Sequence, residues 1–70
     1  MLQYEIKEHL GVIEESAGGW RTELNRIVWN GKTAKLDLRP WNEDHSKMGK
    51  GITLTEEAAD ALMKLLQNRR

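Results

Sequence analysis

The chain has 70 residues, with 11 basic and 11 acidic side chains that leave a formal net charge of zero. Residues 1–70 can form one domain at most, and a core this small usually needs a disulfide, a metal or a partner chain for stability. Because this sequence offers neither of the first two, oligomerisation is the remaining means of stabilisation. The absence of cysteine excludes disulfides and thiolate metal sites, and two histidines far apart in sequence argue against a metal centre. No apolar run is long enough to span a membrane. We therefore expect a soluble cytoplasmic protein.

The first half of the chain predicts two strands joined by a turn. Residues 4–15 alternate apolar and polar side chains, as in a strand with one buried face, and the break near Gly11 predicts a bulge or bend. Ala17-Gly18-Gly19 predicts a turn, and residues 20–29 predict the second strand. Asn30-Gly31 then favours a hairpin, because both positions of a type I′ turn need a positive φ.

Residues 33–39 form the clearest predicted strand, with leucines on one face and charged side chains on the other. Pro40 should end this strand or confine it to an edge of the sheet. Residues 41–50 predict a polar loop, long for so small a domain, and long loops tend to carry function. Residues 51–54 predict a short fourth strand.

A helix is predicted from Thr55, the expected N-cap, nearly to the end of the chain. Its apolar residues cover more of the helix surface than packing on one sheet requires. The surplus predicts a second contact, most simply with the same helix of a second subunit. We expect this dimer interface to contain three leucines: Leu62, Leu65 and Leu66.

The positive charge of the chain is concentrated in its middle. Residues 21–50 hold seven basic and four acidic side chains, residues 1–20 hold one and four, and residues 51–70 hold three of each. The same middle segment contains two tryptophans, a strand with alternating basic residues and the run Gly49-Lys50-Gly51. A sheet that holds single-stranded nucleic acid uses such groups, because bases stack on aromatic rings and cations contact phosphates.

Simpler interpretations compete with this one. The tryptophans could all belong to the core, since tryptophan is highly buried on average, and the charged side chains could be a solvated face. Gly49-Lys50-Gly51 lacks the G-x-x-x-x-G-K-[ST] pattern of a nucleotide phosphate loop. His9 and His45 have no companion ligand at a useful spacing, so structural or surface roles are expected for both. No nucleophile, base and orienting group can be assembled, and we expect neither enzymatic activity nor a small-molecule substrate.

The run from Val28 to Leu66 resembles the C-terminal domain of the eukaryotic transcriptional Positive Cofactor Four family. The matching features are an aromatic residue before a turn glycine, an apolar-Asp-apolar-Arg strand, an aromatic residue after it and a Lys-Gly run into the helix: Trp29, Gly31, Leu36-Asp37-Leu38-Arg39, Trp41 and Lys50-Gly51-Ile52-Thr53-Leu54-Thr55. The whole chain looks like the small bacterial members of this family, of the YdbC type. It departs from the eukaryotic pattern in its basic cluster, of which only Lys47 and Lys50 remain.

The resemblance implies an α+β fold, a four-stranded curved antiparallel sheet followed by one C-terminal helix that forms a homodimer. It also implies sequence-tolerant binding of single-stranded DNA, without a cofactor, by an accessory factor of transcription or DNA maintenance at the nucleoid, with RNA left open as a ligand. Family match and neighbouring positions on the same segments give the expected nucleic-acid-binding residues: Trp20, Arg21, Trp29, Lys32, Lys35, Arg39, Trp41, Lys47 and Lys50. The alternative is a protein-interaction module that binds a polypeptide of the transcription or repair machinery.

Overall fold

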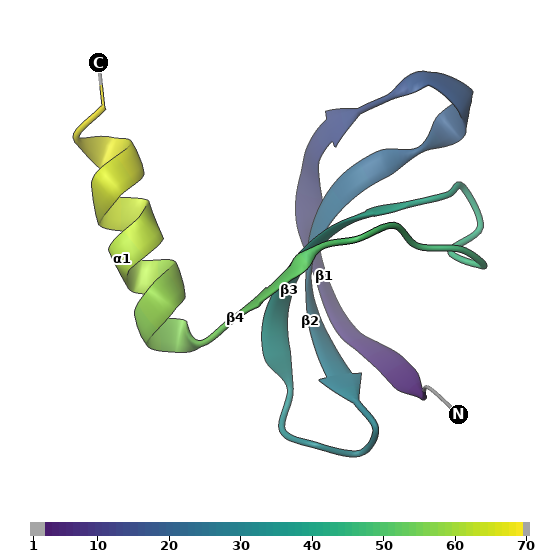
Figure 1. Ribbon diagram of the computed structural model, residues 1–70, viewed down its shortest axis with the longest axis horizontal. Coiled ribbons are helices and arrows are strands. Elements are labelled where there is room, and N and C mark those ends of the chain that lie inside the picture. Colours follow the sequence, from purple (N-terminus) through teal and green to yellow (C-terminus); the bar gives the residue numbers. More distant parts are fainter. Residues whose placement is uncertain (1–2, 70) are drawn as a thin grey trace.

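The computed structural model describes residues 3–69, which form one antiparallel sheet followed by a helix (Figure 1). The strands pair in chain order, and they are β1 (Tyr4–Glu15), β2 (Arg21–Trp29), β3 (Lys35–Trp41) and β4 (Ile52–Leu54). A short 3-10 turn, η1, at Ala17–Gly19 joins β1 to β2, and the helix α1 covers Glu56–Gln67. The predicted α+β class and order of elements are therefore confirmed, while dimerisation stays a prediction.

β1 is longer than the strand with which it pairs. Its 12 residues lie against the nine residues of β2, because the register slips by one residue at three places. Lys7, Leu10 and Ile13 are the residues left between paired positions, so a bulge recurs at every third residue. Each bulge bends the strand and increases its twist, and together they curl β1 around one face of the sheet. The expected break near Gly11 is confirmed as one of the three.

The Asn30-Gly31 turn has the predicted backbone, with φ of 50° and 75°, and the Lys32 N–H donates to the Trp29 carbonyl at 2.9 Å. β3 begins and ends two residues later than predicted, so Pro40 lies inside it. Pro40 pairs with Thr22 of β2, but on its other side β4 pairs with β3 only as far as Leu38, so the β4 ladder needs no N–H from Pro40. The Pro40 carbonyl instead accepts from the Gly49 N–H at 2.9 Å.

The two faces of the sheet differ in character. One face, which we call the apolar face, pairs Leu24 with Leu38 and Leu36 with Leu54. The other, which we call the polar face, carries three buried polar side chains, Glu23, Asn25 and Asp37, beside the fully buried Ile27 and Trp41. Buried polar groups require partners, so the contacts on this face must be specific.

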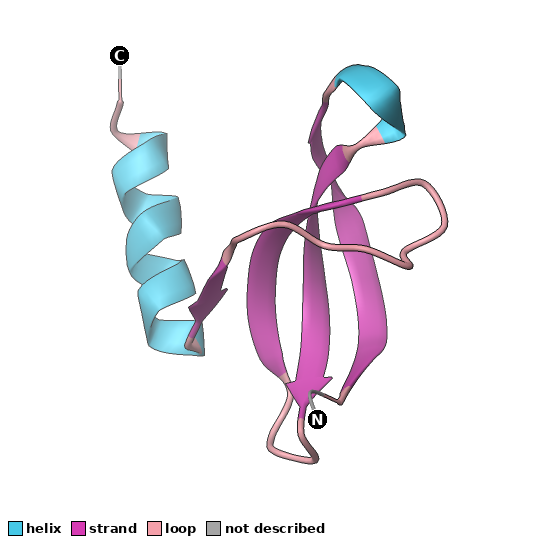
Figure 2. Cartoon of the chain, turned by 45° about the vertical axis from the view of Figure 1, so that its right-hand side comes forward, coloured by secondary structure: helices cyan, strands magenta, loops and turns pink. Residues whose placement is uncertain are grey.

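α1 begins as predicted, since the Thr55 Oγ1 accepts from the Ala58 N–H at 3.0 Å. The helix stands away from the three long strands and is joined to them through β4 (Figure 2). A side-chain contact ties its first turn to the sheet, where Arg26 donates to Glu56 at 2.6 Å. None of the helices among residues 3–69 is long and apolar enough to cross a bilayer.

Candidate nucleic-acid interface

Strand pairing gathers much of the predicted interface on the polar face. The β2–β3 register sets Arg21 opposite Trp41, Glu23 opposite Arg39, and Ile27 opposite Lys35. Because side chains alternate along a strand, Trp29 at the end of β2 belongs to the same face. One side of the sheet therefore carries predicted aromatic and basic residues over the whole length of β2.

Arg39 is held at a fixed position on this face. Its Nε and one terminal nitrogen lie 2.6 and 2.8 Å from the two carboxylate oxygens of Asp37, which also accepts from the Thr53 hydroxyl at 3.3 Å. The guanidinium carbon of Arg39 lies 4.7 Å from the ring centroid of Trp29, within the range of a cation–π contact. The sequence left Arg39 and Arg26 open as partners of Asp37, and the structure shows Arg39 in that position, while Arg26 pairs opposite Leu36. The result is a flat cation layered on an indole ring, which is a surface suited to bases and phosphates.

Tyr4 extends the aromatic surface and was missed at the sequence level. Its ring centroid lies 5.8 Å from that of Trp29 and 5.5 Å from that of Trp41, while His45 lies 5.3 Å from Trp41 on another side. Trp41 is 0% exposed, whereas Trp29 is half-buried. The expectation of an exposed Trp41 ring is therefore wrong for this conformation, because Tyr4 and His45 cover it, and we assign Trp41 to packing. The three-residue bulge pattern that brings Tyr4 inward has no simple sequence signal.

The four lysines of the predicted interface are all exposed, and within residues 3–69 none of them forms an ion pair. Lys32 follows the hairpin turn beside Trp29, and Lys35 begins β3 on the polar face. Lys47 and Lys50 lie in the loop that returns along β3 to β4. All four can move to meet phosphates.

Two glycines hold that returning loop against β3. A Cβ at Gly49 would lie 2.6 Å from the Pro40 Cγ, and a Cβ at Gly51 would overlap the Arg39 Cβ and the Leu38 carbonyl oxygen. The sequence suggested that these glycines allow a close approach of backbone to a ligand. The close approach is to the protein's own strand, and it fixes where Lys50 leaves the sheet.

Trp20 and Arg21 lie at the other end of β2. Trp20 follows η1, where Gly18 and Gly19 have φ of 76° and 80°, and its carbonyl accepts from the Ser16 N–H at 2.7 Å. With a rise of about 3.3 Å per residue, Trp20 and Trp29 are about 30 Å apart along the strand. Arg21 shares the polar face with Trp29, whereas alternation puts Trp20, which precedes β2, on the opposite side. The predicted residues of the polar face therefore form a long track from Trp29 to Arg21, and Trp20 does not belong to it.

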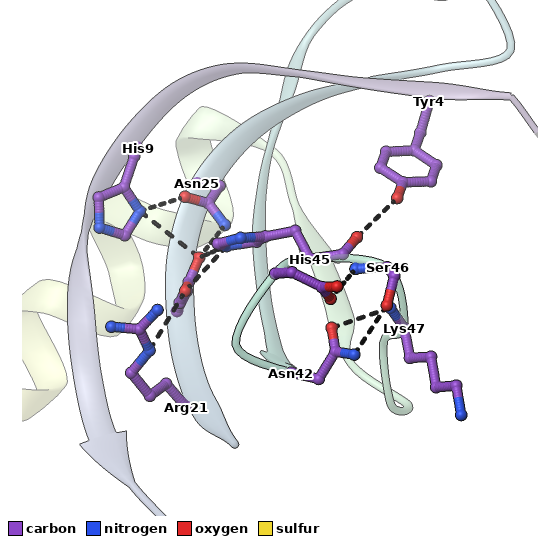
Figure 3. Close-up of polar contacts among 10 residues, drawn as sticks. Tyr4, His9, Arg21, Asn25, Asn42, His45, Ser46 and Lys47 are labelled. Carbon is purple, nitrogen blue, oxygen red and sulfur yellow. Dashed lines mark hydrogen bonds and ion pairs between the residues drawn. The ribbon is translucent and has the colours of Figure 1, made fainter. Parts of the chain in front are cut away.

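A polar cluster in the middle of this track was not predicted. The Glu23 carboxylate accepts from the Asn25 side chain at 3.1 Å, and its two oxygens lie 2.9 and 3.0 Å from the His45 Nε2 (Figure 3). The His9 Nδ1 lies 2.7 Å from the Asn25 side-chain oxygen and 3.5 Å from Glu23, and the Arg21 Nε lies 4.0 Å from Glu23. The only sequence feature that could have indicated this cluster is the presence of Glu23 and Asn25 on the same face of β2 as Ile27.

These contacts set the charge of Glu23. Burial raises the pKa of its carboxyl, but hydrogen bonds from His45 and Asn25 and the charges of His45 and His9 outweigh burial, so the pKa lies below its ordinary value of 4.5. Glu23 is therefore a buried carboxylate in a cluster of hydrogen-bond donors. Within residues 3–69, no group of three or more His, Cys, Asp or Glu side chains has an arrangement that could hold a metal ion.

Comparison with known proteins adds two findings. A family model described as Transcriptional Coactivator p15 (PC4) matches residues 16–65, which include β2, β3, β4 and most of α1. An uncharacterized protein of Treponema pallidum (strain Nichols) is 46% identical over 65 residues, which cover 93% of this chain and 76% of that protein.

Proposed function

The chain belongs to the PC4 family of transcriptional coactivators, and from this membership and the polar face of its sheet we propose that it is a non-enzymatic, single-stranded DNA-binding protein. The observation that carries the proposal is the layer of Arg39 on Trp29, fixed by the buried Asp37. The guanidinium plane and the half-buried indole offer flat surfaces on which a base can stack, while the exposed lysines supply the phosphate contacts.

Binding in this proposal combines stacking with a modest electrostatic term. Each base stacked on an aromatic side chain contributes roughly 1–3 kcal/mol, whatever its identity, so the protein is tolerant of sequence. Lys32, Lys35, Lys47 and Lys50 add phosphate contacts along the track from Trp29 towards Arg21. Because the whole chain has no net charge, stacking supplies the larger share of the affinity.

We further propose that the protein acts as a homodimer joined through α1. Leu62, Leu65 and Leu66 are 40, 71 and 49% exposed, although they are large apolar side chains on one helix. The accessible surface is 5444 Å² for 8.1 kDa, against roughly 4,500 Å² expected of a folded monomer of that mass. The surplus of roughly 900 Å² is close to the area of about 800 Å² that each partner buries in a standard interface.

The alternative, a module that binds a polypeptide of the transcription or repair machinery, would use the same strands and loop as the proposed DNA interface. A second copy of the chain is the simplest occupant of the exposed leucines of α1. We place this activity in the cytoplasm, at the nucleoid.

A binding titration tests the proposed function. Labelled oligo-dT, oligo-rU and a DNA duplex are titrated with the protein and followed by fluorescence anisotropy at two salt concentrations. We expect oligo-dT to bind with a shallow salt dependence, each phosphate contact adding about −0.7 to the slope of log affinity against log salt. Duplex DNA bound as tightly as oligo-dT would contradict the stacking mechanism, since paired bases do not offer their faces to Trp29. Equal affinity for oligo-rU would extend the ligand to RNA.

A further inference from the structure

A cavity of about 320 Å³ opens on the polar face between β1, the first half of β2 and the loop that contains His45. It is lined by Ile6, His9, Arg21, Glu23, Asn25 and His45. Its size is at the lower end of the range for small-ligand sites, about 300–1,000 Å³. The cavity lies on the track proposed for DNA, so any ligand that it takes must be compatible with a bound strand.

The cavity has an acidic floor and a rim that can become cationic. Glu23 is 1% exposed, whereas the side chains of His9, Arg21 and His45 are 51, 35 and 35% exposed. With both imidazoles neutral, the charges of Arg21 and Glu23 cancel. Protonation of both imidazoles gives the same site a net charge of +2. The state of two side chains therefore decides whether the cavity attracts an anion.

Histidine is the side chain whose charge ordinarily changes between pH 5 and 8. The sequence has two histidines, both in this cavity, and no cysteine. Other ionisable groups lie nearby on each element: Tyr4, whose hydroxyl donates to the His45 carbonyl at 3.3 Å, and Glu15 and Glu43 beside Arg21. Asp44, in the loop itself, accepts from the Ser46 N–H at 3.0 Å.

An unpartnered donor gives an independent indication of a ligand. The Arg21 Nε is buried and has no hydrogen-bond partner, its nearest carboxylate oxygen being 4.0 Å away. Buried polar atoms in folded proteins nearly always have a partner. The Nε2 of His9 is also left for a ligand, because its Nδ1 lies 2.7 Å from the Asn25 side-chain oxygen. An oxyanion in the cavity would face the Nε2 of His9 and the exposed part of the Arg21 side chain, whose Nε would gain a partner only after a small movement.

Building on the proposed DNA binding, we propose that this cavity is a proton-coupled phosphate site, in which a phosphodiester of the bound strand accepts from Arg21 and from protonated His9. Protonated His45 adds charge, and Glu23 is a positioning residue that holds both imidazoles at the site. Without protonation, the buried Glu23 repels the phosphate and cancels the attraction of Arg21. The cavity therefore takes phosphate and protons together.

The size of the effect follows from reciprocity. A charge within about 4–6 Å of an ionisable group changes its proton affinity by about tenfold or more. The proton must change the affinity for the phosphate by the same factor. We therefore expect the affinity for oligo-dT to fall about tenfold from about pH 6 to about pH 8, at constant ionic strength.

Two measurements on the full chain test this proposal. Anisotropy titrations with oligo-dT give the ratio of affinities at the two pH values, and calorimetry at intermediate pH in two buffers of different ionisation enthalpy counts the protons taken up. For His9→Gln, we expect the ratio to fall from about tenfold to near one. For the matched control Lys32→Gln, which removes a charge outside the cavity, we expect weaker binding at each pH with the ratio preserved.

The possible outcomes separate this site from the proposed function. Oligo-dT that binds with a flat pH profile and no proton uptake overturns the phosphate site and leaves the DNA-binding proposal standing, whereas absence of binding at both pH values overturns both. A His9→Gln variant that keeps the full ratio also overturns the site. If circular dichroism shows that this variant is unfolded, the wild-type proton count decides alone. Inorganic phosphate that competes with oligo-dT at low pH only would identify free phosphate as a second source of the ligand.

Discussion

Replacing Arg39 with alanine should destabilise the protein strongly before any question of DNA arises. Arg39 is the only cation that contacts the carboxylate of Asp37 within residues 3–69, and it makes two hydrogen bonds of 2.6 and 2.8 Å to it. Asp37 is 0% exposed. The Arg39→Ala variant therefore leaves a buried carboxylate with the Thr53 hydroxyl as its remaining side-chain partner.

The magnitude follows from the cost of an unpaired buried charge. Removing one partner of a buried ion pair costs about 3–5 kcal/mol, and loss of the cation–π contact with Trp29 adds about 0.5–2 kcal/mol. A second change, Asp37→Asn, keeps the shape of the side chain and removes its charge. We expect the double variant to recover about 2 kcal/mol of the loss, because a neutral amide without a partner costs only about 1–3 kcal/mol, while the cation–π contact stays lost.

Denaturant unfolding of the four proteins in this cycle measures the effect. The free energy of unfolding should be compared at one protein concentration, because association would make apparent stability depend on concentration. A loss below about 1 kcal/mol for Arg39→Ala, or a double variant no more stable than the single one, would refute the assignment of Asp37 and Arg39 as a buried pair. DNA binding by Arg39 is best measured against the Asp37→Asn background, where the fold does not depend on the guanidinium.

Three further predictions concern other parts of the molecule. Leu62→Glu should dissociate or unfold the dimer by placing a charge in an apolar contact, which light scattering would detect as a loss of mass; a folded wild-type monomer at high concentration would contradict the interface. Trp29→Ala should weaken oligo-dT binding by about 1–3 kcal/mol and leave the salt slope nearly unchanged in anisotropy titrations, and undiminished binding would remove Trp29 from the interface. The lowered pKa of Glu23 means that the folded state favours its carboxylate form. The contribution of Glu23 to stability is therefore present above pH 4.5, its pKa in the unfolded chain, and is lost as the pH falls through its lower pKa in the folded state. Glu23→Gln should flatten that acid limb in urea unfolding measured against pH, and an unchanged limb would contradict the assignment.

Local chemistry made most of the fold predictable from the sequence. Asn30-Gly31 specified a turn with two positive φ values, Thr55 specified a helix start, and alternation in β3 specified which side chains share a face. Each of these depends on residues within a few positions of one another. Arg39 and Arg26 were both open as partners of Asp37 from the sequence, and the contact forms with Arg39, its neighbour on the same face of β3.

The remainder depended on contacts between distant segments. His9 and His45 are 36 positions apart, and only the curl of β1 and the fold of the loop after β3 bring them to Glu23. The burial of Trp41 has the same origin, because Tyr4 reaches it from the start of β1. The bulges at Lys7 and Ile13 contain no glycine or proline, the residues that would have indicated a bulge in the sequence. A bulge depends on how two strands pair, so the alternation of apolar and polar residues along one strand does not predict where it occurs.

The bulges of β1 have a consequence for how copies of this protein can associate. β1 is an outer strand of the sheet, and an outer strand with a regular row of free N–H and C=O groups invites another strand to pair with it and start a fibril. The three interruptions break that row into segments of two or three residues. The opposite edge, β4, is only three residues long and leads directly into α1. Neither edge is therefore a good template for cross-strand polymerisation, although Leu10 and Ile13 of β1 are exposed.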